Sequence, residues 1–260
     1  MTGTVQAETN WYMVVIPCYN EEQRLPEAAF LSFLAAPPPG LRFLFVNDGS
    51  VDNTLAVLHR LQEDSPRLVD VLDQPRNMGK AEAVRCGMLY AIATGASITG
   101  FWDADLATPL SELPRLLDLM LTKPTVDIVL GSRVRLLGRS ILRKPIRHYS
   151  GRIFATMASL TLNLPIYDTQ CGSKLFRVTQ VLREALATPF GSRWIFDVEL
   201  LARFLVLARN QRPELGEPAL AVYEEPLRHW ADVDGSKLKV SDSIKAFGDI
   251  WKIRRTYFKS

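Results

Sequence analysis

The sequence predicts an α/β fold in which a mostly parallel central sheet is flanked by helices. Two observations lead to this expectation. Apolar runs of strand length alternate with segments of helical periodicity, which is typical of parallel sheets joined by right-handed crossovers. In addition, a polar cluster follows each of the first apolar runs, around Tyr19, Asp48, Asn77 and Asp103. Because the carboxyl ends of parallel strands meet at one edge of a sheet, these clusters are expected to form one site there.

The expected elements alternate regularly along the chain. Strands are expected at residues 11–16, 41–46, 69–72, 97–102, 127–131 and 219–223, and at the end of segment 167–176. Helices are expected at residues 26–34, 81–94 and 113–121, in the apolar segments 153–160 and 194–202, and around Leu55, Leu58 and Leu61. Ser50 and Ser111 are the expected N-caps of the helices that follow them.

Composition indicates a globular protein in a reducing compartment. The chain has 260 residues, of which 47% are hydrophobic, which is enough for the core of one large domain. The net charge of +3 does not demand nucleic acid as a partner. Cys18, Cys86 and Cys171 form no paired framework, so burial as small apolar residues is expected. We expect a flexible segment at 1–10, a main domain at 11–228, and a loop with a basic and aromatic helix at 229–260.

Neither a signal peptide nor a spanning helix is predicted. The first ten residues lack a basic segment followed by an apolar one. The longest uncharged stretch, 153–167, is about fifteen residues, and a spanning helix needs roughly twenty. The expected location is therefore cytoplasmic, with any membrane contact made peripherally on the cytoplasmic face.

The segment Asp103-Ala104-Asp105 lies where an apolar run gives way to a turn. In an extended Asp-x-Asp both side chains leave the same face of the chain. One carboxylate can then ligate a hard cation while the other holds a sugar hydroxyl. Taken alone, the tripeptide fits a solvated turn equally well.

A basic stretch without acidic residues runs from Ile128 to Tyr167. Its arginines precede an apolar segment, a pattern that favours an anionic, amphipathic surface such as a membrane interface. The alternative is a core helix beside a solvated basic turn. The tail from His229 also mixes basic and aromatic residues, but Asp242 and Asp249 interrupt it and no RNA-binding motif accompanies it, so we expect no nucleic acid.

Six motifs together resemble those of family 2 inverting glycosyltransferases, which have the GT-A fold. In chain order they are Val14 to Glu21, Asn47-Asp48-Gly49-Ser50, Asn77-Met78-Gly79-Lys80, Asp103-Ala104-Asp105, Gly131-Ser132-Arg133 and Asp168-Thr169-Gln170-Cys171-Gly172. Within the family the chain is similar to dolichyl-phosphate glucosyltransferases and, less closely, to dolichyl-phosphate mannosyltransferases. The sequence departs from the family pattern at Asn47, where Asp is usual, and at Ala81, where Gly is usual.

The resemblance implies a role for each motif residue. It assigns the nucleotide-sugar to Pro17, Tyr19, Glu21, Asp48, Lys80, Asp103 and Ala104, and a Mg²⁺ or Mn²⁺ ion to Asp105. Arg133, Arg147 and Gln170 are the expected acceptor-binding residues, and Lys237 is expected to assist from a lid loop. Catalytic roles fall to Asp105, Asp168, Arg133 and Lys237. Asp168, or next Asp197 or Glu199, would be a general base if the acceptor were a hydroxyl.

The resulting prediction is a metal-dependent enzyme that moves a hexose, with glucose from UDP-glucose favoured, onto a polyprenyl phosphate at a membrane surface. A phosphate monoester has a second pKa near 6 and needs no base at neutral pH. Three alternatives stay open: a hydroxyl acceptor, GDP-mannose as the donor, and a non-catalytic nucleotide-binding module. The sequence leaves the oligomeric state undetermined.

Overall fold

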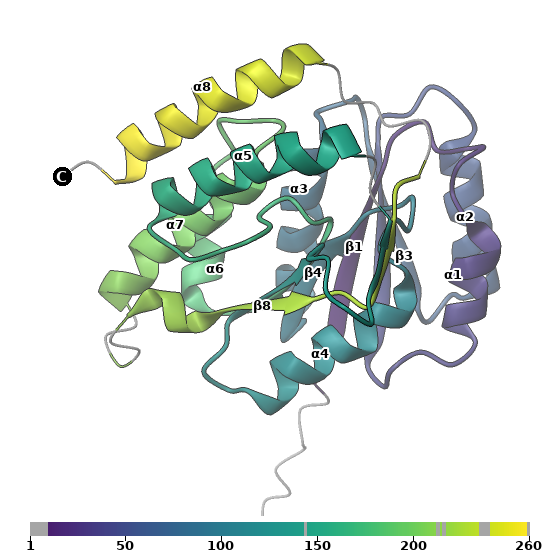
Figure 1. Ribbon diagram of the computed structural model, residues 1–260. Helices are drawn as coiled ribbons and strands as arrows, with labels where there is room; N and C mark the ends of the chain where they lie inside the picture. The colour runs from purple at the N-terminus through teal and green to yellow at the C-terminus, as the bar shows by residue number, and fades with distance from the viewer. Residues whose placement is uncertain (1–9, 143–144, 212–213, 215–216, 234–239, 259–260) are drawn as a thin grey trace, which may run out of the picture.

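A central sheet with helices on both faces forms the core of the molecule (Figure 1). The computed structural model describes residues 10–142, 145–211, 214, 217–233 and 240–258, with the backbone alone for 145–150, 218, 220, 240–244 and 247. The strand order in the sheet is β3-β2-β1-β4-β7-β5-β8. Its strands are β1 (Tyr12–Cys18), β2 (Leu41–Asp48), β3 (Val69–Gln74), β4 (Ile98–Trp102), β5 (Ile128–Ser132), β7 (Ser173–Arg177) and β8 (Val222–Pro226).

The helices follow the strands closely in the chain. They are α1 (Glu27–Leu34), α2 (Thr54–Asp64), α3 (Lys80–Ala93), α4 (Leu113–Thr122), α5 (Pro145–Leu162), α6 (Gln180–Ala185), α7 (Phe196–Gln211) and α8 (Val240–Tyr257). Two short 3₁₀ helices, Leu110–Glu112 and Pro218–Ala221, precede α4 and β8.

The prediction of a mostly parallel sheet is confirmed. β1 pairs in parallel with β2 and β4, β2 with β3, and β5 with β8. Only β7 runs the other way among the strands of this sheet in the described residues, since it is antiparallel to both β4 and β5. The carboxyl ends of β1 to β5 therefore lie at one edge.

Alternation along β1 divides the core into two layers. Met13 and Val15 point to the face covered by α3 and by α5 to α8, whereas Val14 and Ile16 point to the face covered by α1, α2 and α4. Both faces of the strand are buried, which explains why its sequence is continuously apolar. In Figure 1, α1 and α2 lie on one side of the sheet and α8 lies beyond α5 and α7 on the other.

Several local predictions were wrong. Helix α2 begins at Thr54 instead of directly after Ser50, because the Ser50 hydroxyl accepts a hydrogen bond from the Asn20 N–H at 3.0 Å. Ser111 lies inside a 3₁₀ turn, and α4 begins at Leu113. The last strand of the central sheet begins at Val222, since 218–221 form the second 3₁₀ helix.

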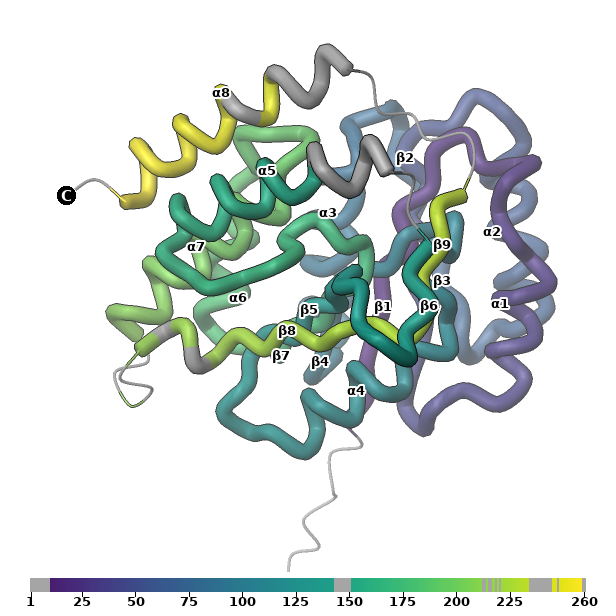
Figure 2. Tube along the Cα trace, in the orientation of Figure 1, coloured from purple at the N-terminus to yellow at the C-terminus, as the bar shows by residue number. Residues whose placement is uncertain are grey.

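A second sheet was not predicted. Its two strands, β6 (Ser140–Leu142) and β9 (His229–Ala231), are only three residues each and pair in parallel (Figure 2). The pairing joins the chain beyond residue 228 to the main body. The boundary proposed at 228 stays a prediction, and residues 1–9 lie outside the described part of the chain.

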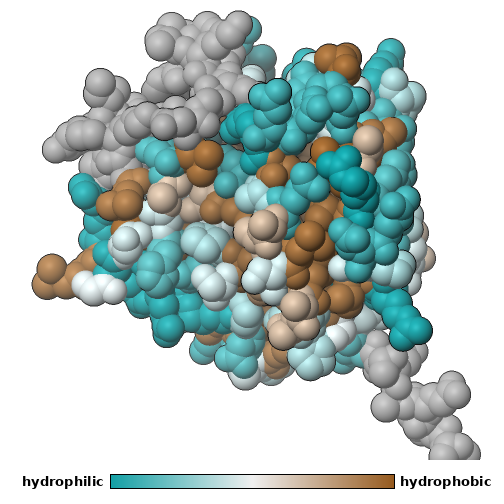
Figure 3. All heavy atoms as spheres, turned by 90° about the vertical axis from the view of Figure 1, so that its right-hand side faces the viewer, coloured by the Kyte–Doolittle hydropathy of each residue, from teal (hydrophilic) through white to brown (hydrophobic). Residues whose placement is uncertain are grey.

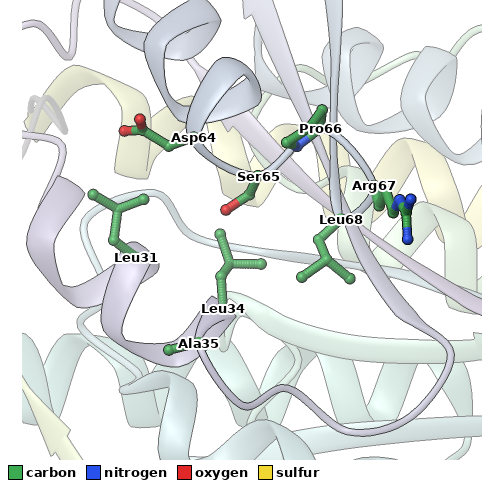
Figure 4. A pocket seen from close by; sticks show the side chains of 8 residues that line it. All are labelled: Leu31, Leu34, Ala35, Asp64, Ser65, Pro66, Arg67 and Leu68. Atoms are coloured by element: carbon green, nitrogen blue, oxygen red, sulfur yellow. The ribbon is translucent and has the colours of Figure 1, made fainter.

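Surface features away from the site are modest. Seen from the side of α1 and α2, the surface is largely hydrophilic with patches of apolar residues (Figure 3). An open hollow lies between the ends of α1 and α2, lined by residues such as Leu34 and Leu68 (Figure 4). Since Leu68 precedes β3, the hollow lies at the edge where the strands begin, opposite to the motifs. No helix in the described residues is long and apolar enough to cross a membrane.

Candidate functional site

The loops after β1 and β2 are joined by hydrogen bonds between side chains and backbone. Asn20 accepts a bond from Val51 N–H at 3.0 Å, and its own N–H donates to Ser50. The N–H of Glu21 donates to the Thr54 hydroxyl at 2.7 Å. Asn20 adopts a left-handed φ of 51°, a conformation that Asn tolerates better than most residues. The first two motifs therefore form one surface, which holds Pro17, Tyr19 and Glu21, all partly buried.

Asp48 at the end of β2 holds the loop that precedes α3. Its two carboxylate oxygens accept the N–H groups of Met78 at 2.7 Å and Gly79 at 2.8 Å. Burial raises the pKa of Asp48, and these two bonds offset part of that effect. A Cβ on Gly49 would lie 2.3 Å from the backbone of Arg76, so only glycine allows the loops to approach this closely. Asp48 thus positions the turn from which Lys80 projects.

Asp103 and Lys80 form an ion pair at the end of β4. Burial opposes the charge of Lys80, but the carboxylates of Asp103, Asp197 and Asp105 together outweigh this effect, and the pKa of Lys80 is raised. The side chains remain 41% and 31% exposed for Lys80 and Asp103, so a ligand can reach both. A Cβ on Gly172 would lie 1.8 Å from the Asp103 carboxylate, and the Asp103 N–H donates to the Gly172 carbonyl at 2.9 Å. The Asp168 to Gly172 motif therefore fixes the position of Asp103.

Asp105 lies in the turn that follows. Its carboxylate accepts the Ala107 N–H at 3.1 Å, Leu106 adopts a φ of 51°, and Ala104 is buried. Burial and then the neighbouring Asp103 charge raise the pKa of Asp105. A divalent cation would relieve this repulsion, and carboxylate oxygens are the ligands that Mg²⁺ and Mn²⁺ prefer. The described residues contain no group of three or more acidic, histidine or cysteine side chains that could hold a metal ion, so metal binding at Asp105 stays a prediction.

Arg133 and Asp168 form a bidentate ion pair beyond β5, in which Asp168 is buried and Arg133 is partly buried. The Arg133 Nε and Nη2 donate to the two Asp168 oxygens at 2.6 and 2.8 Å, and the Arg133 N–H donates to the same carboxylate. Burial opposes ionisation, but the charge and hydrogen bonds of Arg133, together with the charge of Lys174, outweigh this effect and lower the pKa of Asp168 to about 2. Glu224 of β8 accepts the N–H groups of Tyr167 and Asp168 at 2.8 and 2.7 Å. The Arg133 guanidinium also lies 5.3 Å from the ring centre of Trp230.

The other predicted acceptor and lid residues lie in different surroundings. Gln170 is exposed on the turn beside Asp168, and its N–H donates to the Asp168 carboxylate at 3.2 Å. Arg147 belongs to α5, and its side chain is outside the described structure. Lys237 also lies outside the described residues. The roles predicted for these residues therefore stay predictions.

The two further candidate bases have structural partners. Asp197 pairs with Lys174 at 2.8 Å, and the Lys174 side chain is only 1% exposed. Glu199 accepts hydrogen bonds from Ser192 N–H, from Arg203 and from other neighbours. Both carboxylates therefore have local roles in holding α7 against the sheet and the preceding loop.

Sequence reasoning missed three residues at the edge of the sheet where the carboxyl ends of β1 to β5 lie. Lys174, Glu224 and Arg193 lie in no motif that we singled out for chemistry. A lysine beside Leu175 and Phe176 in the buried strand β7 is a usable signal, because a buried charge needs a partner. Glu224 and Arg193 had no such signal, since each acquires its contacts only when distant segments meet.

Solved structures identify the class of fold. The chain is similar to structures of glucosyl-3-phosphoglycerate synthase from Mycobacterium tuberculosis. One, a complex with Mn²⁺, UDP-glucose and phosphoglyceric acid, has a TM-score of 0.65 at 18% identity and covers 95% of this chain and 80% of that one. Another, with Mn²⁺ and UDP-glucose, has a TM-score of 0.62 at 20% identity and covers 96% and 81%. The fold is that of the GT-A glycosyltransferases.

The family follows from sequence. Residues 13–182 match the family described as Glycosyl transferase family 2. A dolichyl-phosphate beta-glucosyltransferase of Trichomonas vaginalis is 32% identical, covering 95% of this chain and 71% of that protein. Those of Drosophila melanogaster and Homo sapiens are 35% and 32% identical, covering 86% and 88% of this chain and 68% and 70% of theirs. The chain belongs to glycosyltransferase family 2 and is a glycosyltransferase, as its motifs predicted.

Proposed function

We propose that this enzyme transfers glucose from UDP-glucose to a polyprenyl phosphate, such as dolichyl phosphate, with inversion at the anomeric carbon. The observation that carries the proposal is the Arg133–Asp168 pair, a guanidinium held in a fixed orientation beside the Asp-x-Asp turn. Relatives named dolichyl-phosphate beta-glucosyltransferase support this substrate assignment over most of the chain. Arg133 also interacts electrostatically with Asp103, which indicates that acceptor and donor groups would be close together.

In this proposal the donor lies across the loops after β1, β2 and β4. Pro17, Tyr19 and Glu21 contact the nucleotide beside the loop that Asp48 holds. Lys80 and Asp103 lie where ribose or sugar hydroxyls and phosphate charge would be bound. A Mg²⁺ or Mn²⁺ ion bound at Asp105 would supply charge neutralisation for the diphosphate leaving group.

The acceptor needs orientation more than deprotonation. A phosphate monoester is largely a dianion at neutral pH, so it can attack without a general base. Asp168, with a pKa of about 2 and both oxygens bonded to Arg133, is a weak base in this arrangement. Its role in the proposal is to hold the guanidinium, whose remaining nitrogen Nη1 would donate to the acceptor phosphate. Gln170 and Arg147 would extend this acceptor site.

Membrane contact is proposed for the segment 133–142, which begins at Arg133. Leu137 is fully exposed, and Leu142 and Leu136 are 62% and 47% exposed. Together with Arg135 and Arg139 they line an open hollow. Exposed leucines beside arginines suit a surface of anionic lipid. We therefore propose that this segment attaches peripherally to the cytoplasmic face of a membrane.

The test is transfer of labelled glucose from UDP-glucose, with Mn²⁺ or Mg²⁺, to dolichyl phosphate. The proposal is supported if label moves into the organic phase with dolichyl phosphate as the acceptor and does not do so when dolichol replaces dolichyl phosphate. Transfer from GDP-mannose in place of UDP-glucose would reassign the donor. Transfer to dolichol or to a soluble sugar alone would refute the acceptor assignment, and no transfer or hydrolysis at all would favour a non-catalytic module.

A further inference from the structure

An exposed arginine outside the family motifs lies over the loop that Asp48 holds. The Nη2 of Arg193 donates to the Met78 carbonyl at 3.1 Å. A Cβ placed on Gly79 would be 3.2 Å from the Arg193 Nε, so the guanidinium lies directly against this glycine. Arg193 precedes α7, and its contact with Met78 joins parts of the chain that are more than a hundred residues apart.

Hydrogen bonds from largely buried polar side chains hold the segment that carries Arg193 in place. Glu199, 4% exposed, accepts the N–H groups of Gly191 and Ser192 at 2.9 and 3.2 Å. The Ser192 hydroxyl donates to Asp249 of α8 at 2.8 Å. The buried Arg203 donates to the carbonyls just before this segment, at Thr188 and Pro189. A network of largely buried hydrogen bonds therefore holds the segment from which the exposed Arg193 guanidinium projects.

The charge distribution indicates what this guanidinium would bind. The Lys80 ammonium is already paired with the Asp103 carboxylate, and Asp48 and Asp105 add further negative charge at this edge of the sheet. A phosphate bound here therefore needs another positive group, such as the Arg193 guanidinium, to balance these carboxylates. Gly79 has no side chain to cap the first turn of α3, and the N-terminus of a helix favours an anion. An anionic group beside Gly79 would thus meet the α3 N-terminus and Arg193 together.

We propose that Arg193 is a donor-binding residue that donates hydrogen bonds to a phosphate of the nucleoside diphosphate beside Gly79. The proposal rests on the proposed function, because it requires a nucleotide donor in this site. A planar guanidinium fixed in orientation suits phosphate better than a flexible ammonium group does. The same contact would keep the 77–79 loop closed over the donor.

The experiment compares the binding of uridine, UDP and GDP to the wild type, R193Q and R193K by calorimetry in the presence of Mn²⁺. R193Q is expected to weaken UDP binding roughly 10- to 100-fold, the usual effect of losing a charge-assisted hydrogen bond, with uridine binding unchanged. R193K is expected to restore part of the loss. The control is R67Q, which removes an exposed arginine at the opposite edge of the sheet and is expected to bind UDP like the wild type.

The outcomes separate the two proposals. UDP binding to R193Q within about twofold of the wild type, or an equal loss of uridine binding, would refute the role of Arg193 and leave the proposed function intact. Wild-type preference for GDP would refute the proposed donor, and a loss of GDP binding in R193Q would then still support Arg193. A wild type that binds no nucleotide would overturn both proposals.

Discussion

Replacing Asp168 by Asn tests the central ion pair of the proposed acceptor site. The substitution keeps the shape of the side chain but removes the charge that Arg133 faces. The pKa of Asp168 is about 2 in the fold and 3.8 ordinarily. At about 1.4 kcal/mol for each pKa unit, the carboxylate contributes about 2–3 kcal/mol to the free energy of unfolding at pH 7. D168N is therefore expected to lose at least that much stability, since it also leaves the partly buried Arg133 without its counter-charge.

The sign of the pH dependence provides an independent check. Because the folded pKa is depressed, the contribution is complete well above pH 4 and is lost as the pH falls through 2. In urea unfolding, the difference in the free energy of unfolding between the wild type and D168N should be about 1 kcal/mol smaller at pH 3 than at pH 7. The matched control is D118N, which neutralises an exposed carboxylate on α4 and should change little.

The same variant distinguishes orientation from base catalysis. If Asp168 orients Arg133, D168N should raise the KM for dolichyl phosphate and lower kcat, while the pH profile of kcat keeps its shape. A D168N protein as stable as the wild type at pH 7 would refute the energetic reasoning. Loss of an acidic limb from the pH profile of kcat would instead make Asp168 a base.

Three further variants test other parts of the site. In G172A, a Cβ 1.8 Å from the Asp103 carboxylate must displace it, so kcat/KM for glucose transfer should fall more than tenfold in a protein whose far-UV circular dichroism is unchanged, roughly 1.4 kcal/mol or more in transition-state energy. In D105N, calorimetry should show that Mn²⁺-dependent binding of UDP-glucose is lost. In the wild type, this binding should weaken as the pH falls toward the raised pKa of Asp105, because protons compete with the metal ion for the carboxylate. In K174M, the buried Asp197 loses its counter-charge, so urea unfolding should show about 3–5 kcal/mol less stability, and the double variant K174M/D197L should recover much of it.

The sheet and the gathering of motifs were predictable because both follow from short-range patterns. Continuous apolar runs identified β1 and β2, and turn residues marked where each strand ends. Parallel pairing then requires those ends to meet. The strands β6 and β9 were not predictable in this way, since three residues carry no periodicity and their partners are almost ninety positions apart.

Partnerships between side chains were the part that sequence patterns could not provide. Asp168 was predicted as a base only for a hydroxyl acceptor, and no local pattern indicated its ion pair with Arg133, which lies 35 positions earlier in the chain. Ser50 was predicted as a helix cap, but its hydroxyl bonds Asn20 in another loop. For Ser50, this tertiary contact replaced the role that the local sequence indicated.

The two departures from the family motifs can be understood from their surroundings. Asn47 donates its amide N–H to the Asp73 carboxylate of β3 at 2.7 Å, and its amide oxygen accepts the Ser50 N–H at 3.3 Å. An Asp at position 47 would lack the amide N–H that donates to Asp73, and its charge would repel the Asp73 carboxylate. The Asn at position 47 therefore complements Asp73. Ala81 is buried in the core, where its methyl group packs with residues of the sheet face that α3 covers. Because that methyl group points into the core, the departure at 81 leaves the Gly79 backbone free to approach a phosphate.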